Sequence, residues 1–134
     1  MNLQQLLARY AEHTKIKNIA SLLANPDTLQ RLQMTGMSGS QEAFLLAAIS
    51  QSLEGLNLVI AFDKEDAAYL QNDLANITDG KKVHFFPDSF KRPAHFEELN
   101  TANVLQRTEL INKVICANPA KQWVVTYPEA LFEM

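Results

Sequence analysis

The chain has 134 residues, of which 47% are hydrophobic and 20% are charged, which is the balance of one ordinary globular domain. Its net charge of −3 lacks the basic excess of a domain that holds nucleic acid by itself, so we expect no strong DNA binding. No apolar run is long enough to cross a bilayer, and the amino terminus lacks the residue order of a secretion signal. These features predict a cytoplasmic protein with no membrane partner, and the single cysteine excludes an internal disulfide.

The first 27 residues are predicted to form two short helices or one bent helix. Apolar residues recur there at helical spacing in two groups, namely Leu3, Leu6, Leu7 and Tyr10, and then Ile16, Ile19, Ala20 and Leu23. Asn25-Pro26-Asp27 ends the pattern, because proline disfavours helix in the residue before it. Residues 1–27 are therefore expected to be a helical segment in front of a second unit, residues 28–134.

Strands and helices alternate through that second unit. The predicted strands are residues 29–35, 56–62, 83–86 and 123–126. The predicted helices are residues 41–53, 64–78 and 101–117, with a last turn from residue 128. Alternation of this kind favours parallel strands joined by right-handed crossovers, with helices on both faces. The fold class expected is α/β, a three-layer sandwich with a mainly parallel sheet of about four strands behind one or two N-terminal helices.

The first two predicted strands differ in their patterns. In residues 29–35, the polar Arg31 and Gln33 alternate with apolar residues, so this strand is expected near a sheet edge or against a polar neighbour. Residues 56–62 are the most apolar segment, and they predict a buried strand. We place Ile60 of this strand and Leu70 of the following helix in the hydrophobic core.

The segment after the first predicted strand lies where an ATP-binding P-loop would lie, between a strand and a helix. A working P-loop reads G-x-x-x-x-G-K-[ST]. Counting from Gly36 puts Gln41, Glu42 and Ala43 at the positions of the second glycine, the lysine and the hydroxyl residue. Glu42 would repel the phosphates that a lysine neutralises, and Ala43 has no hydroxyl for magnesium. We therefore predict a degenerate, helicase-like P-loop that binds no nucleotide, with no cofactor, no metal and no catalytic residue.

The same turn is expected to have a structural role. Gly36 and Gly39 permit a tight reversal in which φ becomes positive. Ser38 or Ser40 is placed to cap the helix that follows. The residues assigned to this degenerate turn are Gly36, Ser38, Gly39, Ser40, Gln41, Glu42 and Ala43.

Two other chemistries fit the sequence less well. Gly36-x-Ser38-x-Ser40 is close to the G-x-S-x-G nucleophile elbow, but its base would have to be His84 or His95. His84 lies within a predicted strand, where we expect it to pack. Asp63 and the acidic residues after it are at the start of a predicted helix, which favours capping over paired catalytic carboxylates.

Five segments, in this order and spacing, resemble the N-terminal module of bacterial transcription-repair coupling factors. They are Thr35–Ser40 with the Ala/Leu-rich helix after it, Leu58–Asp63 with Ala67, Leu70, Asp73 and Leu74, Phe85–Pro87 with Pro93, Gln106-Arg107, and Val124–Thr126 with Glu129–Leu131. The resemblance covers about residues 28–134. After Pro93 the family tends to have an aromatic-acidic pair, whereas this chain has Ala94-His95, so no role is carried over to the loop at 87–99.

That module is similar to the excision-repair protein UvrB, whose P-loop is intact, whereas the copy in coupling factors is degenerate. The resemblance implies a non-catalytic scaffold and interaction subdomain of a longer protein. That protein displaces stalled RNA polymerase with a separate ATP-dependent DNA translocase and recruits UvrA for nucleotide excision repair. UvrA, RNA polymerase and the other subdomains are thus the partners implied, and the UvrA-contacting residues would follow Met134.

Two alternatives stay open. The chain could be the nucleotide-binding P-loop domain of a UvrB-like helicase, which the residues at 41–43 disfavour. It could also be a stand-alone α/β protein that binds a small ligand at the carboxyl ends of its strands. The chain stops at Met134, just as a helix begins, and this favours a piece of a longer protein.

Overall fold

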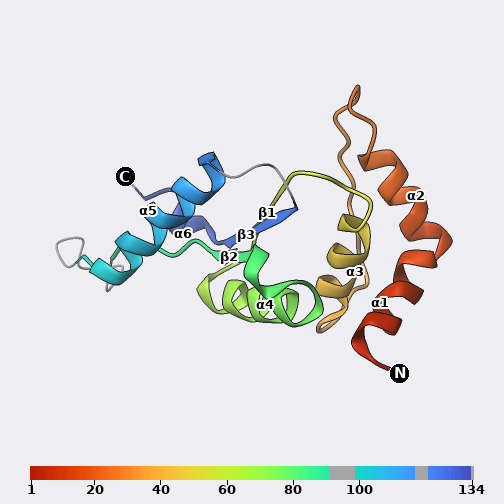
Figure 1. Ribbon diagram of the computed structural model, residues 1–134, viewed down its shortest axis with the longest axis horizontal. Coiled ribbons are helices and arrows are strands. Elements are labelled where there is room, and N and C mark those ends of the chain that lie inside the picture. The colour runs from red at the N-terminus through yellow and green to blue at the C-terminus, as the bar shows by residue number, and fades with distance from the viewer. Residues whose placement is uncertain (91–98, 117–120, 134) are drawn as a thin grey trace.

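The computed structural model describes residues 1–90, 99–116 and 121–133. Its elements are α1 (Leu3–Glu12), α2 (Thr14–Leu23), α3 (Gln41–Ser50), β1 (Leu56–Ile60), α4 (Lys64–Ile77), the 3-10 turn η1 (Gly80–Lys82), β2 (Val83–Phe85), α5 (Thr101–Cys116), β3 (Gln122–Thr126) and α6 (Pro128–Leu131). The protein is therefore an α/β protein, as the alternating sequence pattern predicts (Figure 1).

The three strands form one parallel sheet in the order β1-β3-β2. β3 is the central strand, and its Val124 lies opposite Leu58 of β1 and His84 of β2. Helices separate the strands along the chain, as parallel pairing requires. The prediction of a parallel sheet is confirmed, although the described residues contain three strands and not four.

The segment at 29–35 is not a strand, so that prediction is wrong. Its apolar side chains remain largely in solvent, with Leu29 88% exposed and Leu32 42% exposed. Alternating polarity favours an extended backbone, but a strand also needs a neighbour for its N–H and C=O groups. Here Met34 and Thr35 line a cavity with Leu45 of α3, and the segment has no place in the sheet.

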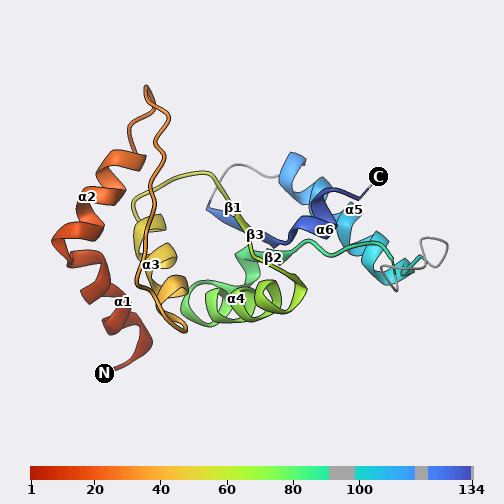
Figure 2. The same cartoon turned by 180° about the vertical axis from the view of Figure 1, so that it is seen from behind.

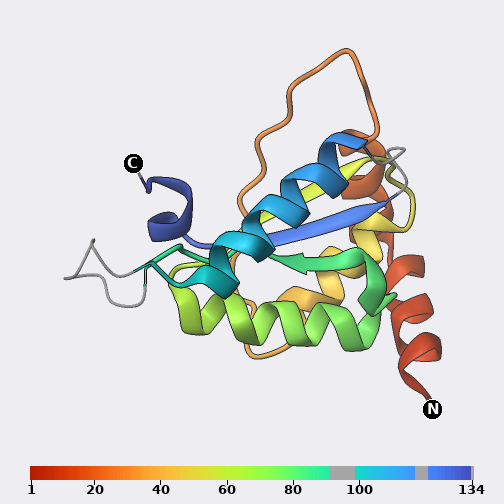
Figure 3. The same ribbon diagram turned by 60° about the vertical axis from the view of Figure 1, so that its left-hand side comes forward.

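Helices lie on both faces of the sheet. Figures 1 and 3 show α4 on one face and α5 on the other. α4 contacts β2 and β3. On the opposite face, Gln106 of α5 donates a hydrogen bond to the carbonyl oxygen of Phe85, at 3.1 Å. α3 packs against α4, and the two amino-terminal helices α1 and α2 pack against α3 (Figure 2).

The hydrophobic core lies between the sheet and the layer of α3 and α4. Its largest fully buried side chains are Tyr127, Leu74, Val125 and Thr126. Val59 of β1 packs against this core, and so does Leu70 of α4, as expected. Ile60, however, is 55% exposed, so its assignment to the core is wrong. The reason is that β1 is an edge strand: Val124 on β3 is buried, whereas Leu58 beside it is exposed.

Local chemistry sets the helix boundaries. The amino-terminal segment is two short helices, because His13 ends α1 and its Nδ1 accepts a hydrogen bond from the backbone N–H of Lys15 at the start of α2. Asp63 caps α4, since its Oδ1 accepts from the N–H of Asp66 at 2.9 Å. The interpretation of Asp63 as a capping residue is thus confirmed.

Candidate functional site at the turn before α3

The candidate site is the turn that leads into α3. Gly36 and Gly39 have φ angles of 81° and 56°, and no other type of residue has a positive φ in the described chain. The amide of Gln41 donates to the carbonyl oxygen of Ser38 at 3.3 Å, which closes the reversal. These angles confirm the prediction that the two glycines supply positive φ. Glycine is suited to these positions because L side chains rarely adopt this backbone conformation.

Neither serine caps α3 through its hydroxyl. Ser40 occupies the N-cap position, but its side chain makes no capping hydrogen bond. Its backbone has φ −71° and ψ 1°, which is not the extended conformation that aims an N-cap hydroxyl at the first amides. At the start of the helix, it is the carbonyl oxygen of Ser38, and not its hydroxyl, that accepts a hydrogen bond, from the amide of Gln41. The prediction of a serine cap is therefore wrong.

An acidic cavity separates this turn from β1 and α4. It has a volume of about 590 Å³ and is bounded by Gly39 and Ser40 on one side and by the carboxyl end of β1 on the other. Ligands of α/β folds commonly bind at this end of the strands. Among the described residues, the charged side chains in its lining are Glu42, Asp66 and Asp73, with no lysine or arginine beside them. A phosphate group here would meet these like charges, so the cavity disfavours a nucleotide.

The turn also lacks the framework of a P-loop. A P-loop joins a sheet strand to a helix, whereas the residues before Gly36 are not paired in the sheet. Ala43 is fully buried in the core, and Gln41 faces a neighbouring cavity. The helicase-like part of the fold prediction is therefore not supported. The structure shows a glycine-containing turn that enters a helix.

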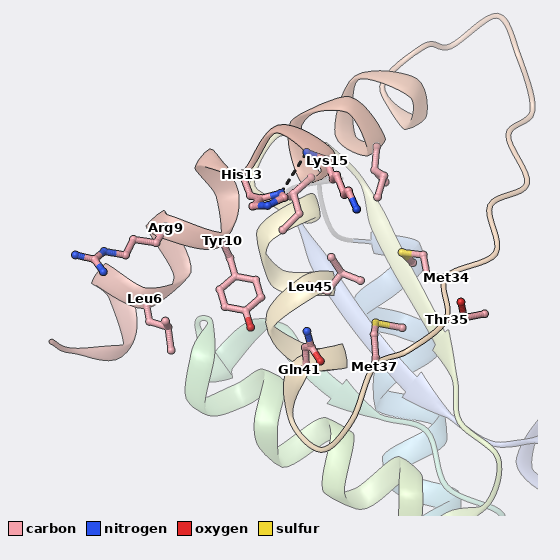
Figure 4. A pocket seen from close by; sticks show the side chains of 12 residues that line it. Leu6, Arg9, Tyr10, His13, Lys15, Met34, Thr35, Met37, Gln41 and Leu45 are labelled. Carbon is pink, nitrogen blue, oxygen red and sulfur yellow. Dashed lines mark hydrogen bonds between the residues drawn. The ribbon is translucent and has the colours of Figure 1, made fainter.

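The second cavity lies between the turn and the two amino-terminal helices. Its volume is about 650 Å³. In Figure 4, Tyr10 of α1 and Gln41 of α3 extend toward one another, and Met34 and Met37 bound the other side. Arg9, His13 and Lys15 also belong to this mainly apolar lining. The space suits a small apolar group or a side chain of a neighbouring protein.

The structure does not bring together the parts of a serine nucleophile site. The Nε2 atom of His84 lies 3.1 Å from Oε1 of Gln122, at the amino end of β3. Ser38 belongs to the turn that faces the carboxyl end of β1, which is the opposite end of these parallel strands. His84 therefore has a side-chain partner within the sheet, as a packing role predicts. His95 lies outside the described residues.

A polar cluster on the far side of the molecule was not predicted. Arg107 of α5 donates from Nη1 to the carbonyl oxygens of Pro87, at 2.7 Å, and Ala130, at 2.9 Å. It also pairs with Glu133 at 3.1 Å and lies over the ring of Phe86, 4.2 Å from the centroid. These contacts clamp the end of β2 to α5 and α6. No spacing rule links such distant residues, so the sequence carried no signal for the cluster.

Tyr127 completes that cluster. Its side chain is 1% exposed, and its hydroxyl oxygen accepts a hydrogen bond from the amide of Asp88 at 2.9 Å. Burial disfavours the phenolate, and the nearby Asp88 carboxylate opposes it too, so the pKa of Tyr127 is raised to about 12. The neutral hydroxyl thus acts as a structural acceptor for the amide of Asp88.

Within the described ranges, no three His, Cys, Asp or Glu side chains are placed to hold a metal ion, and no helix is long and apolar enough to cross a membrane. The chain was compared with protein-family models, with curated proteins and with solved structures, and none of them matches it.

Proposed function

We propose that this chain is a non-catalytic scaffold subdomain of a transcription-repair coupling factor. In that role it would help to link the removal of stalled RNA polymerase to nucleotide excision repair. UvrA and RNA polymerase would be engaged through the full-length protein, in which the ATP-driven translocase lies elsewhere.

The observation that carries the proposal is the chemistry of the turn before α3. Gln41, Glu42 and Ala43 stand where a P-loop requires glycine, lysine and a hydroxyl residue. In the part of the chain that the structure describes, the cavity beside them presents Glu42, Asp66 and Asp73 and no basic side chain. A turn of this kind supports a structural task, because Gly36 and Gly39 shape it and its residues at 41–43 offer neither a lysine nor a hydroxyl group to a phosphate.

The spacing of the five family-like segments supports the same proposal. They fall on α3 and the turn before it, on β1 with α4, at the end of β2, on α5, and on β3 with α6. Each strand is followed by a helix, and the strands pair in parallel. A subdomain built this way offers faces for neighbouring subdomains without any active site of its own.

The test uses the full-length protein with two substitutions in the turn. Glu42→Ala should leave ATP turnover, polymerase displacement and UvrA capture unchanged, because the carboxylate takes part in no catalytic step. Gly39→Val should weaken UvrA capture, since it strains the turn and destabilises the subdomain that positions the next one. ATPase rate, polymerase displacement and a UvrA pull-down are measured for both. Loss of ATP turnover in a folded Glu42→Ala protein would show that the turn belongs to a functional nucleotide site and would contradict the proposal.

The second candidate function is a stand-alone domain that binds a small apolar ligand. The 650 Å³ cavity favours it, because its lining includes Leu6, Ile16, Met34 and Met37. Mass spectrometry of the native protein separates the two candidates. Peptides of this chain should occur in a polypeptide far heavier than 15.1 kDa if it belongs to a coupling factor. A native protein of about that mass would favour the stand-alone domain.

A further inference from the structure

Local contacts fix the walls of the cavity between the turn and the amino-terminal helices. Tyr10 of α1 stacks on Phe44 of α3, with ring centroids 5.6 Å apart. Gly36, at a φ of 81°, turns the chain between Met34 and Met37, which both line the cavity. Its volume of about 650 Å³ suits a small molecule. The cavity is therefore a formed part of the fold with room for a ligand.

Most of the lining is apolar and comes from α1, α2, α3 and the segment before α3. These side chains are Leu6, Ile16, Ile19, Met34, Met37 and Leu45. An alkyl chain placed against them leaves water, and each methylene that is fully buried raises affinity about fourfold, the equivalent of ~0.8 kcal/mol. The lining thus favours a ligand with a flexible hydrocarbon part.

The charges of the lining are all of one sign. Among the described residues, Arg9 and Lys15 are its charged side chains, and no carboxylate lines it. Neither of them forms an ion pair with another described residue. In Figure 4 the Lys15 side chain extends from the start of α2 toward the side of Leu45, whereas Arg9 points away from the other lining residues. Lys15 therefore presents an unpaired cation to the cavity.

His13 adds a hydrogen-bond donor near this cation. Its Nδ1 accepts from the backbone N–H of Lys15 at 3.3 Å, so the neutral ring carries its proton on Nε2. His13 lines the cavity too, and no described group accepts a hydrogen bond from that Nε2. The chain as a whole has a net charge of −3, so any attraction for an anion must be local to such groups.

We propose that this cavity binds a small amphipathic carboxylate, with its alkyl or acyl chain against the apolar lining and its carboxylate at Lys15. Charge complementarity selects this class, since a neutral ligand leaves the ammonium group without an anion and a cation is repelled by it. The proposal rests on the cavity that favours the second candidate function, and it names the ligand class. It does not require a stand-alone protein, so the mass of the native protein and ligand binding are separate tests.

Titration calorimetry of the intact chain with hexanoate, octanoate and decanoate tests the site. Binding should be saturable, and affinity should rise about two- to fourfold for each added methylene. Lys15→Gln should weaken octanoate binding about three- to fivefold and leave 1-octanol binding unchanged, because only the carboxylate uses the charge. The matched control is Lys17→Gln, since Lys17 is exposed on α2 outside this lining and should leave octanoate binding unchanged.

Met34→Glu tests the apolar wall. Met34 is 37% exposed, so the substitution should not unfold the chain, and its carboxylate should weaken octanoate binding about tenfold or more. Leu29→Glu is the control, because Leu29 is 88% exposed on the same segment and outside the lining. Three results overturn the proposal: no saturable octanoate binding, an equal loss of octanol and octanoate binding in Lys15→Gln, or equal octanoate affinity in Met34→Glu and Leu29→Glu.

Discussion

Gly39 holds a φ of 56° at the point where the chain turns into α3. A Cβ built on Gly39 meets no atom within 4 Å, so space does not restrict this position. The restriction lies in the backbone, because a β-branched residue is strained at positive φ. The importance of this residue is therefore conformational and does not depend on a contact.

We expect Gly39→Val to lower the free energy of unfolding by roughly 1–3 kcal/mol, the cost of one strained backbone residue. The measurement is urea unfolding followed by circular dichroism. Ser40→Ala is the control and should change the free energy by less than about 0.5 kcal/mol, because the Ser40 side chain makes no capping bond. Equal stability of Gly39→Val and the wild-type protein would contradict the left-handed turn.

Tyr127 links stability to alkaline pH. Its pKa is raised from 10.0 to about 12 by burial, so the unfolded chain loses the phenolic proton before the folded chain does. Stability from this group is complete below pH 10, and it falls by about 1.4 kcal/mol per pH unit as the pH rises toward 12. Urea unfolding at about pH 9 and pH 11 should show this fall, which Tyr127→Phe should make smaller.

The control for that measurement is Tyr69→Phe, since Tyr69 is 73% exposed on α4. It should show the same fall in stability as the wild-type protein. Tyr127→Phe should also lower stability at neutral pH by about 1–3 kcal/mol, because the amide of Asp88 loses its acceptor. A pH dependence that is identical in both variants would mean that Tyr127 ionises as freely in the folded chain as in the unfolded chain.

At the scale of elements, α4 contributes more to the core than β1 does. Leu74 of α4 is fully buried, whereas Ile60 of β1 is 55% exposed. The apolar composition of β1 suggested the reverse order. Composition predicts that a segment is extended and apolar, but the position of the strand in the sheet decides how much of it is covered.

Leu74→Ala should therefore cost about 2–5 kcal/mol, the range for a buried leucine that leaves a cavity. Ile60→Ala should cost less than about 1 kcal/mol, because its side chain already meets water. Both values come from urea unfolding followed by circular dichroism. A larger loss for Ile60→Ala than for Leu74→Ala would place β1 in the interior and contradict the sheet order.

At the scale of the whole molecule, the charge distribution matters more than the shape of any turn. The cavity at the carboxyl end of β1 is the customary ligand position of an α/β fold, and here it is lined by three carboxylates. The net charge of the chain is −3, so its long-range field also opposes a polyanion.

Titration calorimetry with Mg-ATP should therefore show no binding at millimolar nucleotide. Glu42→Lys removes the acidic group nearest the turn, and we still expect no micromolar affinity, because Ala43 supplies no hydroxyl for the metal. A micromolar dissociation constant for the wild-type chain, about −8 kcal/mol of binding free energy, would contradict this electrostatic argument.

Local sequence chemistry determined much of the architecture of this protein. The break at Asn25-Pro26-Asp27, the Asp63 cap and the two glycines at positive φ all act within a few residues, so each could be predicted from neighbours in the chain. The alternation of helices and strands likewise predicted the α/β class and the parallel pairing. That residues 42 and 43 are neither a lysine nor a hydroxyl residue was also plain in the sequence.

Tertiary structure alone decided which apolar segments became sheet and which faces were covered. Residues 29–35 and β1 both have strand-like patterns, yet only β1 pairs with another strand. Strand pairing needs backbone N–H and C=O groups from a segment that is distant in the chain, so a local pattern does not determine it. The exposure of Ile60 follows from the position of β1 at the edge of the sheet. The Arg107 clamp and the raised pKa of Tyr127 arise from residues that folding brings together, so no local pattern could contain them.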